Sequence, residues 1–421
     1  VGDGTEDTTM TFDGQVSDIN TALSWLVFHP EADYVGSAAS LTITTNDQGY
    51  LGSGGPQEDS DSVAIELTVV PAFADSPSHT TFPAALDTSF GTDGMQVLSE
   101  TVNIDYIRSL KLLSSGKILA VGAVDNYFGM LRFNSDLSLD TSFGTDGVVT
   151  TPNTWGRHAE DVIEHPEGGL LVVGRDNLVR YTDDGALDTS FGTNGIADGD
   201  NRFNWGSSVA ITADGRIVVG GDDGGGSQWS QAYYSLSGEY LTHAYVNQGS
   251  SRWNPASLQG VYPSGDGTIV MVGHASGYLR SVRVGPTGHH IADYDLPSIG
   301  NTGSQQSMQL PDGKILLVGR GSSGSNFNLS VTRINQDGSP DYSFGTDTGV
   351  TLVPLSSGRS EFGYGVSLQA DGKILLVGDM DNDSNRDIVV ARLNYDGSLD
   401  TSFDGDGAFH VPDLTQDDET G

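Results

Sequence analysis

The sequence predicts an all-β chain whose main part is a six-bladed β-propeller. Three observations predict this fold: a five-residue motif that recurs about every 50 residues, a run of branched aliphatic residues that recurs in step with it, and repeats that show no convincing 3.6-residue hydrophobic period. Units of about 50 residues that each hold about four short strands are typical of propeller blades.

The recurring motif is Leu-Asp-Thr-Ser-Phe, and degenerate copies complete the series. The copies start at Leu86, Leu139, Leu187, Leu241, His290, Pro340 and Leu399. The Asp, Thr and Ser side chains can hydrogen-bond to nearby backbone and fix a turn, and the Phe can fill the space between adjacent sheets. We therefore interpret the motif as part of the scaffold.

The aliphatic run lies between two glycines and has the same length in every copy. Its copies start at Gly116, Gly168, Gly215, Gly267, Gly313 and Gly372. Such a run is apolar on both faces, which suits a strand between two neighbouring sheets, and an Asp-Gly turn precedes four of the runs. An arginine stands at a fixed offset before the motif and is expected to pair with the motif aspartate or with blade-edge carbonyls; these are Arg132, Arg180, Arg283, Arg333 and Arg392, with Tyr233 in one unit.

The repeat count leaves one strand over. Six complete units predict six blades, and the strand from Gly407 to Val411 follows the last motif without a blade of its own. We expect this strand to close the ring. A seven-bladed propeller is the alternative, if the two ends of the chain build a further blade together.

The repeats resemble a known family. DGKILLVG at residues 371–378 and ARLNYDGSLDTSF at residues 391–403 look like the delta-60 repeats, which are associated with β-propellers in large secreted or surface proteins of bacteria. The resemblance covers about residues 86–411 and departs in two units, where the motif has eroded to LTHAY and HIADY. It implies the fold and a location outside the cell, but it brings no catalytic residues.

The sequence of residues 1–70 predicts a domain different from the propeller repeats. Alternation at Thr42–Thr44 and a final strand at Val63–Val69, separated by turn residues, indicate a small β-sandwich. The segment resembles the cadherin-like or immunoglobulin-like repeats of bacterial adhesins, but it opens in the middle of such a domain, so we expect a partial sandwich from a longer protein. The resemblance also implies calcium ligands at Glu6, Asp7, Asp47, Asp59 and Asp61. Residues 71–85 then form a linker, residues 86–411 the propeller and residues 412–421 an acidic tail.

The composition is typical of an extracellular protein. The chain has 56 acidic and 19 basic residues, a net charge of -37 and no cysteine. Such a surface repels nucleic acid and anionic membranes and attracts divalent cations. No apolar stretch of 18 residues is present, so we expect no direct insertion into a membrane. We expect an extracellular or bacterial cell-surface location.

A candidate calcium site follows one of the aliphatic runs. Oxygen-bearing side chains occupy every second position there, and Ca²⁺ takes six to eight oxygen ligands. The residues are Asp379, Asp381, Asp383, Asn385 and Asp387. The loop is not an EF-hand, because Ser384 stands where glycine is needed and Val390 where the bidentate Glu belongs. A solvated acidic loop is the alternative.

A candidate ligand site combines aromatic residues and arginines in the loops that lead into the first strand of each unit. The repeat places equivalent loops on one face of a propeller, where aromatic rings stack on sugars and arginines bind carboxylates. The residues are Tyr106, Trp155, Arg157, Arg202, Trp205, Arg252, Trp253, Arg359 and Phe362, accompanied by Arg108 and Tyr364. In the alternative, the tryptophans pack between blades and the arginines neutralise excess acid.

The sequence contains no recognisable catalytic motif. We therefore predict a non-enzymatic adhesion or binding module of a large bacterial protein. Its partners would be a glycan or a cell-surface protein and the other domains of the same long chain, and calcium would stiffen its loops. A polysaccharide hydrolase or lyase on a propeller scaffold is one alternative, and a purely architectural spacer or assembly subunit is the other.

Overall fold

All regular structure in the described residues is β-strand. The computed structural model describes residues 36–46, 58–67, 103–152, 158–174, 177–197, 205–222, 228–246, 256–275, 278–297, 303–323, 326–345, 348–353, 359–381 and 386–411. Within these ranges no helix is long and apolar enough to cross a membrane. The chain divides into two compact units, Val1–His79 and Thr80–Gly421.

The first unit contributes one described hairpin. Strands β1 (Gly36–Asn46) and β2 (Glu58–Leu67) pair antiparallel, with Leu41 opposite Val63. β1 contains the predicted alternation at Thr42–Thr44, and β2 overlaps the predicted strand Val63–Val69 as far as Leu67. The other strands of the expected cadherin-like sandwich fall outside the described residues, so that sandwich stays a prediction.

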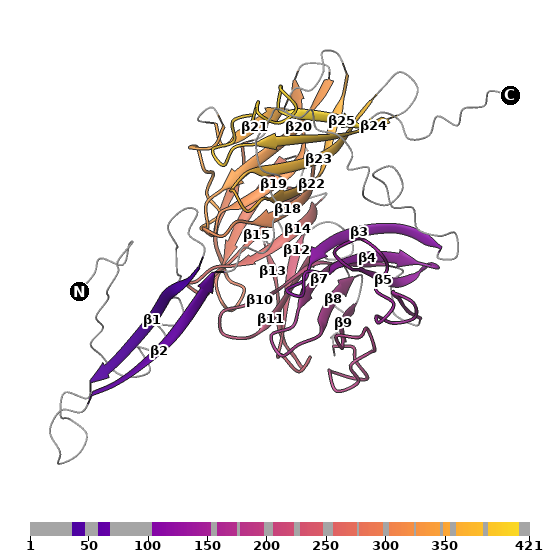
Figure 1. Cartoon of the computed structure of the whole chain (residues 1–421), viewed down its shortest axis with the longest axis vertical. Helices are drawn as coiled ribbons and strands as arrows, with labels where there is room; N and C mark the ends of the chain where they lie inside the picture. Colours follow the sequence, from indigo (N-terminus) through magenta and orange to yellow (C-terminus); the bar gives the residue numbers. More distant parts are fainter. Residues whose placement is uncertain are drawn as a thin grey trace. The chain divides into compact units, whose positions relative to one another are not determined.

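The second unit consists of six consecutive antiparallel sheets, and the strands of each sheet follow one another in chain order (Figure 1). The first sheet comprises β3 (Ile104–Leu112), β4 (Ile118–Val124), β5 (Tyr127–Phe133) and β6 (Val148–Thr151). The second comprises β7 (Ala159–Glu164), β8 (Leu170–Gly174) and β9 (Asn177–Tyr181). The third comprises β10 (Trp205–Ile211), β11 (Ile217–Asp222), β12 (Trp229–Tyr234) and β13 (Tyr240–Val246).

The remaining three sheets have four strands each. They comprise β14 (Ala256–Pro263), β15 (Ile269–Ala275), β16 (Tyr278–Val284) and β17 (His290–Asp295); β18 (Gly303–Gln309), β19 (Ile315–Ser323), β20 (Asn326–Ile334) and β21 (Val350–Val353); and β22 (Glu361–Leu368), β23 (Ile374–Asp381), β24 (Arg386–Leu393) and β25 (Ala408–Val411). The chain is an all-β protein with a six-bladed β-propeller, so the predicted fold and the predicted number of blades are confirmed.

One detail of the prediction is wrong. The strand expected to close the ring, β25, pairs antiparallel with β24 and is the fourth strand of the sixth sheet. The reason is the place of the motif within a blade. The motif copies at Leu139 and Pro340 connect the third strand of a sheet to the fourth strand of the same sheet, β5 to β6 and β20 to β21. The copy at Leu399 therefore completes a blade.

The second strand of each sheet is the aliphatic run. In β8 the side chains of Leu171, Val172 and Val173 are fully buried, although successive side chains of a strand point to opposite faces. Burial on both faces requires a neighbouring sheet on either side. The preceding turn requires glycine for its backbone: Gly372 has φ +79° and no atom within 4 Å of a Cβ placed there, so conformation rather than space selects it.

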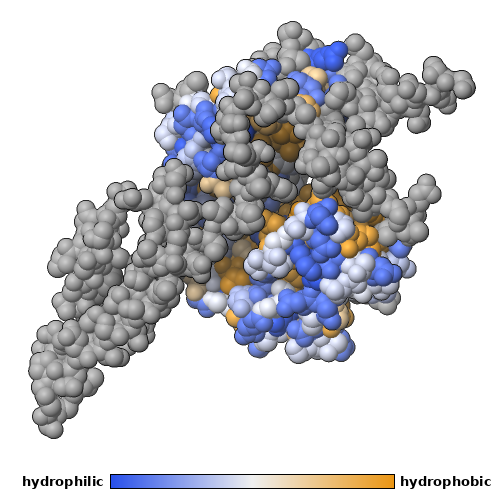
Figure 2. Space-filling model, viewed as in Figure 1, coloured by the Kyte–Doolittle hydropathy of each residue, from blue (hydrophilic) through white to orange (hydrophobic). Residues whose placement is uncertain are grey.

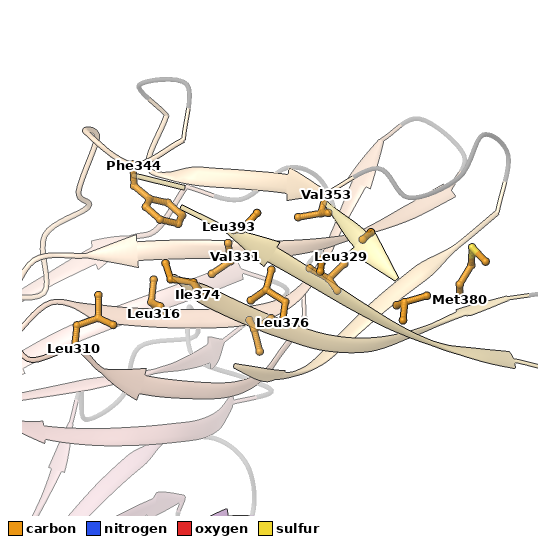
Figure 3. Close-up of a cluster of buried hydrophobic side chains, with 14 residues drawn as sticks. Leu310, Leu316, Leu329, Val331, Phe344, Val353, Ile374, Leu376, Met380 and Leu393 are labelled. Atoms are coloured by element: carbon orange, nitrogen blue, oxygen red, sulfur yellow. The ribbon is translucent and has the colours of Figure 1, made fainter. Parts of the chain in front are cut away.

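Hydrophobic clusters join each sheet to the next. In the cluster of Figure 3, Leu329 and Val331 of β20 pack with Ile374 and Leu376 of β23. Other clusters join the first sheet to the second, the second to the third, the third to the fourth and the fourth to the fifth. No cluster among the described residues joins the sixth sheet to the first.

The motif phenylalanine is buried at the junction with the following sheet. Phe143, Phe191 and Phe344 are fully buried, as the sequence predicts. Each ring lies against a glycine in the turn before the motif of the next sheet, where a Cβ would lie 2.8 to 2.9 Å from the ring. These glycines are Gly185, Gly238 and Gly397. We call this arrangement the phenylalanine–glycine contact.

The motif aspartate pairs with the preceding arginine, which was also expected. Arg132 Nε lies 2.6 Å from an oxygen of Asp140, and the same guanidinium donates to the backbone carbonyl of Asp183 in the next sheet. Arg333 and Asp341 make the equivalent pair at 2.6 Å. Arg283 instead pairs with Asp266, because its unit carries the eroded motif. The arginine thus pairs with the aspartate of its own motif. Where the motif is intact, it can also donate a hydrogen bond to a backbone carbonyl of the neighbouring blade.

Truncating a buried motif phenylalanine should destabilise the propeller strongly. Phe344→Ala leaves a cavity between two sheets, so we expect the free energy of unfolding to fall by about 3–5 kcal/mol. Urea denaturation measures this change. Phe403→Ala is the matched control, because Phe403 occupies the same motif position but is only half-buried; its loss should be clearly smaller. Equal losses would contradict the described packing.

The arginine–aspartate pairs predict that acid lowers the stability of the propeller. Burial raises the pKa of Asp341, but hydrogen bonds from Ser343, Lys314 and Arg333 outweigh it and hold the pKa well below the usual 3.8. Such a group stabilises the fold above the unfolded-state pKa, and this stability is lost as the pH falls through the folded-state pKa. Melting temperature should therefore fall steeply below about pH 4, and Asp341→Asn should flatten that slope. A slope unchanged by the substitution would contradict this assignment.

Candidate functional site

The strand register brings the predicted aromatic residues to one edge of the propeller. In the first, third and sixth sheets, an aromatic residue of the first strand pairs with the residue that follows the last glycine of the aliphatic run. The pairs are Tyr106 with Ala123, Trp205 with Asp222, and Phe362 with Asp379. Since these strands begin at the same end of successive sheets, the three positions lie on the same face of the propeller.

The structure describes part of the predicted ligand site. Tyr106, Arg359 and Phe362 lie within the described residues, as do Arg108 and Tyr364, whereas Trp205 is described only through its backbone. The remaining predicted residues fall outside the described ranges; these are Trp155, Arg157, Arg202, Arg252 and Trp253. A complete aromatic ring around the channel mouth therefore stays a prediction.

A polar cluster links the first and second sheets on this face. The Tyr106 hydroxyl lies 2.5 Å from His158 Nδ1, and His158 Nε2 lies 2.8 Å from Glu160 Oε1. Arg108 stands 4.8 Å from the Tyr106 ring centroid and 3.7 Å from Glu160. Sequence reasoning missed His158. The alignment of the repeats could have indicated it, because His158 occupies in the second sheet the position that Tyr106 occupies in the first.

An aromatic–arginine cluster links the fifth and sixth sheets. Its members are Phe362 of β22, Arg320 of β19, Phe327 of β20 and Arg386 of β24. The Arg320 guanidinium carbon lies 4.7 Å from the Phe327 centroid and 5.6 Å from the Phe362 centroid. Arg386 lies 4.7 Å from the same Phe362 ring. Cations at such distances from a ring face are attracted by its negative centre.

Arg320 differs from the other described arginines. It makes ring contacts only, and its Nε is buried without a hydrogen-bond partner. Every other arginine in the described part of the chain pairs with a carboxylate, apart from Arg359, which also makes an interaction. Sequence reasoning missed Arg320, although it directly follows the glycine of an aliphatic run, at the register position that faces the start of the first strand.

The candidate calcium loop begins beside this cluster. Arg386 reaches both Asp379 and Asp381 at 3.1 Å, so a guanidinium lies between two of the predicted ligands. The hydrogen bond and charge of Asp379 raise the pKa of Arg386. Asp387 is the second residue of β24 and lies opposite Met380, while Asp383 and Asn385 fall outside the described residues.

Calcium at this loop stays a prediction. The described residues contain no group of three or more His, Cys, Asp or Glu side chains that could hold a metal ion. A cation in this loop would have to compete with Arg386 for the oxygens of Asp379 and Asp381.

Solved structures with related folds are distant. A protein from Lactobacillus plantarum shares 14% identity over 89% of this chain and 100% of its own, with a TM-score of 0.44. A protein of unknown function from Bacteroides caccae shares 13% over 70% of this chain and 98% of its own, with a TM-score of 0.41. The extracellular domain of a hybrid two-component system from B. thetaiotaomicron shares 11% over 69% of this chain and 32% of that chain, with a TM-score of 0.41. At these values none of them informs the function.

Sequence similarity to a defined family is confined to the repeats. No curated protein is significantly similar to the chain. Residues 113–143, 168–191, 310–344 and 369–403 match the family described as "Domain of unknown function (DUF5122) beta-propeller". Each matched segment runs from the turn before an aliphatic run into or through a motif, so the match falls on the elements that build the blades. Together with the fold, these matches support the assignment of the repeats to a β-propeller repeat family.

Proposed function

We propose that this protein is a non-enzymatic binding or adhesion module, and that the propeller face carrying Phe362 recognises a glycan or protein ligand through an anionic group. The observation that carries the proposal is Arg320, a half-buried arginine without an anionic partner in a chain with 56 acidic and 19 basic residues. In so acidic a protein, carboxylates of the chain itself are abundant, and nine of the other described arginines pair with one.

The physical argument rests on desolvation. A buried guanidinium nitrogen that lacks a hydrogen-bond partner costs roughly 1–3 kcal/mol, and more when the group is charged. An incoming carboxylate recovers that cost and binds the planar guanidinium in a bidentate manner. Phe327 and Phe362 already flank Arg320 and limit its freedom, so less entropy is lost when the ligand binds. A carboxylated sugar or an acidic side chain of a protein carries the required group.

The proposed location is outside a bacterial cell, at its surface or secreted. The net charge of -37 disfavours nucleic acid and anionic membranes as partners. The same charge favours divalent cations, so calcium at the loop after Asp379 is part of the proposal, with a stiffening role. Other domains of a longer chain would present the propeller to its ligand.

A glycan and protein binding screen with matched variants tests the proposal. We expect the wild-type protein to bind a carboxylated glycan or an acidic protein surface, and Arg320→Ala to weaken that binding at least about tenfold, which corresponds to the loss of one charged hydrogen-bonding group. Phe362→Ala should weaken it less, because it removes only one flanking ring. Tyr342→Ala is the control: Tyr342 is 60% exposed, but it lies in the motif at the opposite edge of the sheets.

Three outcomes would contradict the proposal. Binding that is unchanged in Arg320→Ala would place the ligand elsewhere. The absence of any ligand for the wild type would favour an architectural role. Turnover of an acidic polysaccharide would favour the enzyme alternative.

A further inference from the structure

The first sheet exposes a position that is buried in the next three sheets. Leu110 of β3 is 62% exposed, whereas the equivalent residues Val162, Val209 and Val261 are 1 to 3% exposed. These valines point toward the preceding sheet, and Val162 packs in the cluster that joins the first and second sheets. Leu112, on the same face of β3, is also 62% exposed. Figure 2 shows hydrophobic side chains at the surface where β3 lies in Figure 1.

The sixth sheet exposes the complementary positions. Val377 of β23 is 43% exposed, although its equivalents Val121 and Val318 are fully buried against the following sheet. Ile388 of β24 is 46% exposed, whereas its equivalent Leu329 is fully buried. The equivalent positions in other sheets show what covers each face. A following sheet covers the positions equivalent to Val377 and Ile388, and a preceding sheet covers the position equivalent to Leu110.

The junction between these two faces also lacks its phenylalanine–glycine contact. Phe403 is present in the sixth sheet, but it is only half-buried. The turn of the first sheet that would receive it carries Leu137 at φ +59°, where the other turns carry glycine. A Cβ at this position would lie within 3 Å of a phenylalanine seated as in the other junctions.

The residue that donates a backbone hydrogen bond across the intact junctions differs at the same place. In the intact junctions, the glycine after the phenylalanine donates its N–H to a turn carbonyl of the next sheet: Gly144 to Asp184, Gly192 to Ser237 and Gly345 to Asp396, each at 2.8 Å. Asp404 replaces this glycine in the sixth sheet. Both sides of the junction therefore depart from the repeat.

In a six-bladed propeller the sixth sheet is the neighbour of the first. We propose that this junction is held by the apolar residues of β3, β23 and β24 alone, without a phenylalanine–glycine contact. This junction is then the one at which the ring opens first. A second copy of the chain is the weaker candidate, because two chains of net charge -37 repel each other and because the two faces already share one chain, which raises their effective concentration.

Distances between spin labels test the closure in the intact chain, which has no native cysteine. Nitroxides at Ser115→Cys and Asp371→Cys report on the sixth-to-first junction, and labels at Ser115→Cys and Glu167→Cys report on the first-to-second junction. These residues occupy equivalent exposed turns between first and second strands. We expect the two pairs to give the same principal distance in double electron–electron resonance, with a broader distribution for the sixth-to-first pair.

The remaining outcomes decide between the alternatives. A single, much longer distance for the Ser115–Asp371 pair would overturn closure. A short distance that disappears on dilution with unlabelled protein would show that the faces pair between copies instead. Leu137→Gly should narrow the distribution by making room for Phe403, while Asp146→Gly, which relieves another left-handed residue outside the junction, should not. No narrowing, or equal narrowing by both variants, would overturn the role given to the missing contact.

Discussion

The structure depends on the burial of each aliphatic strand between two neighbouring sheets. A strand such as β8 is apolar on both faces, so an isolated blade would expose one hydrophobic face to water. Repetition solves this problem, because each sheet covers the face of the one before it. At the junctions with an intact motif, the motif phenylalanine and the receiving glycine add a further contact between the two sheets.

This dependence explains which parts of the fold the sequence predicts. Features that recur in every unit, such as the aliphatic run, the Asp-Gly turn and the motif, predict the strands and the number of blades. The position of a blade boundary does not recur as a residue pattern. The sequence therefore predicts a ring-closing strand after the last motif, although β25 is the fourth strand of the sixth sheet, since a motif repeat looks the same wherever the unit is taken to begin.

The candidate site was less predictable for the same reason. The repeat predicts that Tyr106 and Phe362 share an edge, because they occupy equivalent places in their units. The prediction that they lie in loops is wrong, since both belong to the start of a first strand. Arg320 and His158 do not belong to a recurring motif. Only the strand register shows that each lies beside an aromatic ring. That Arg320 has no anionic partner is a property of its three-dimensional surroundings, which a chain with 56 acidic residues gives no reason to expect. Arg386 shows the converse, since its guanidinium pairs with Asp379 and Asp381, which the sequence alone suggested as ligands of a cation.

Native-state hydrogen exchange, resolved by strand, tests the central claim most directly. If covered faces hold the sheets together, the second strands with a neighbour on both sides, β8, β11, β15 and β19, should exchange only by global unfolding, and β3, β23 and β24 should exchange sooner through opening at the sixth-to-first junction. Uniform protection across all six sheets, or faster exchange in a middle sheet than in the sixth, would contradict the account.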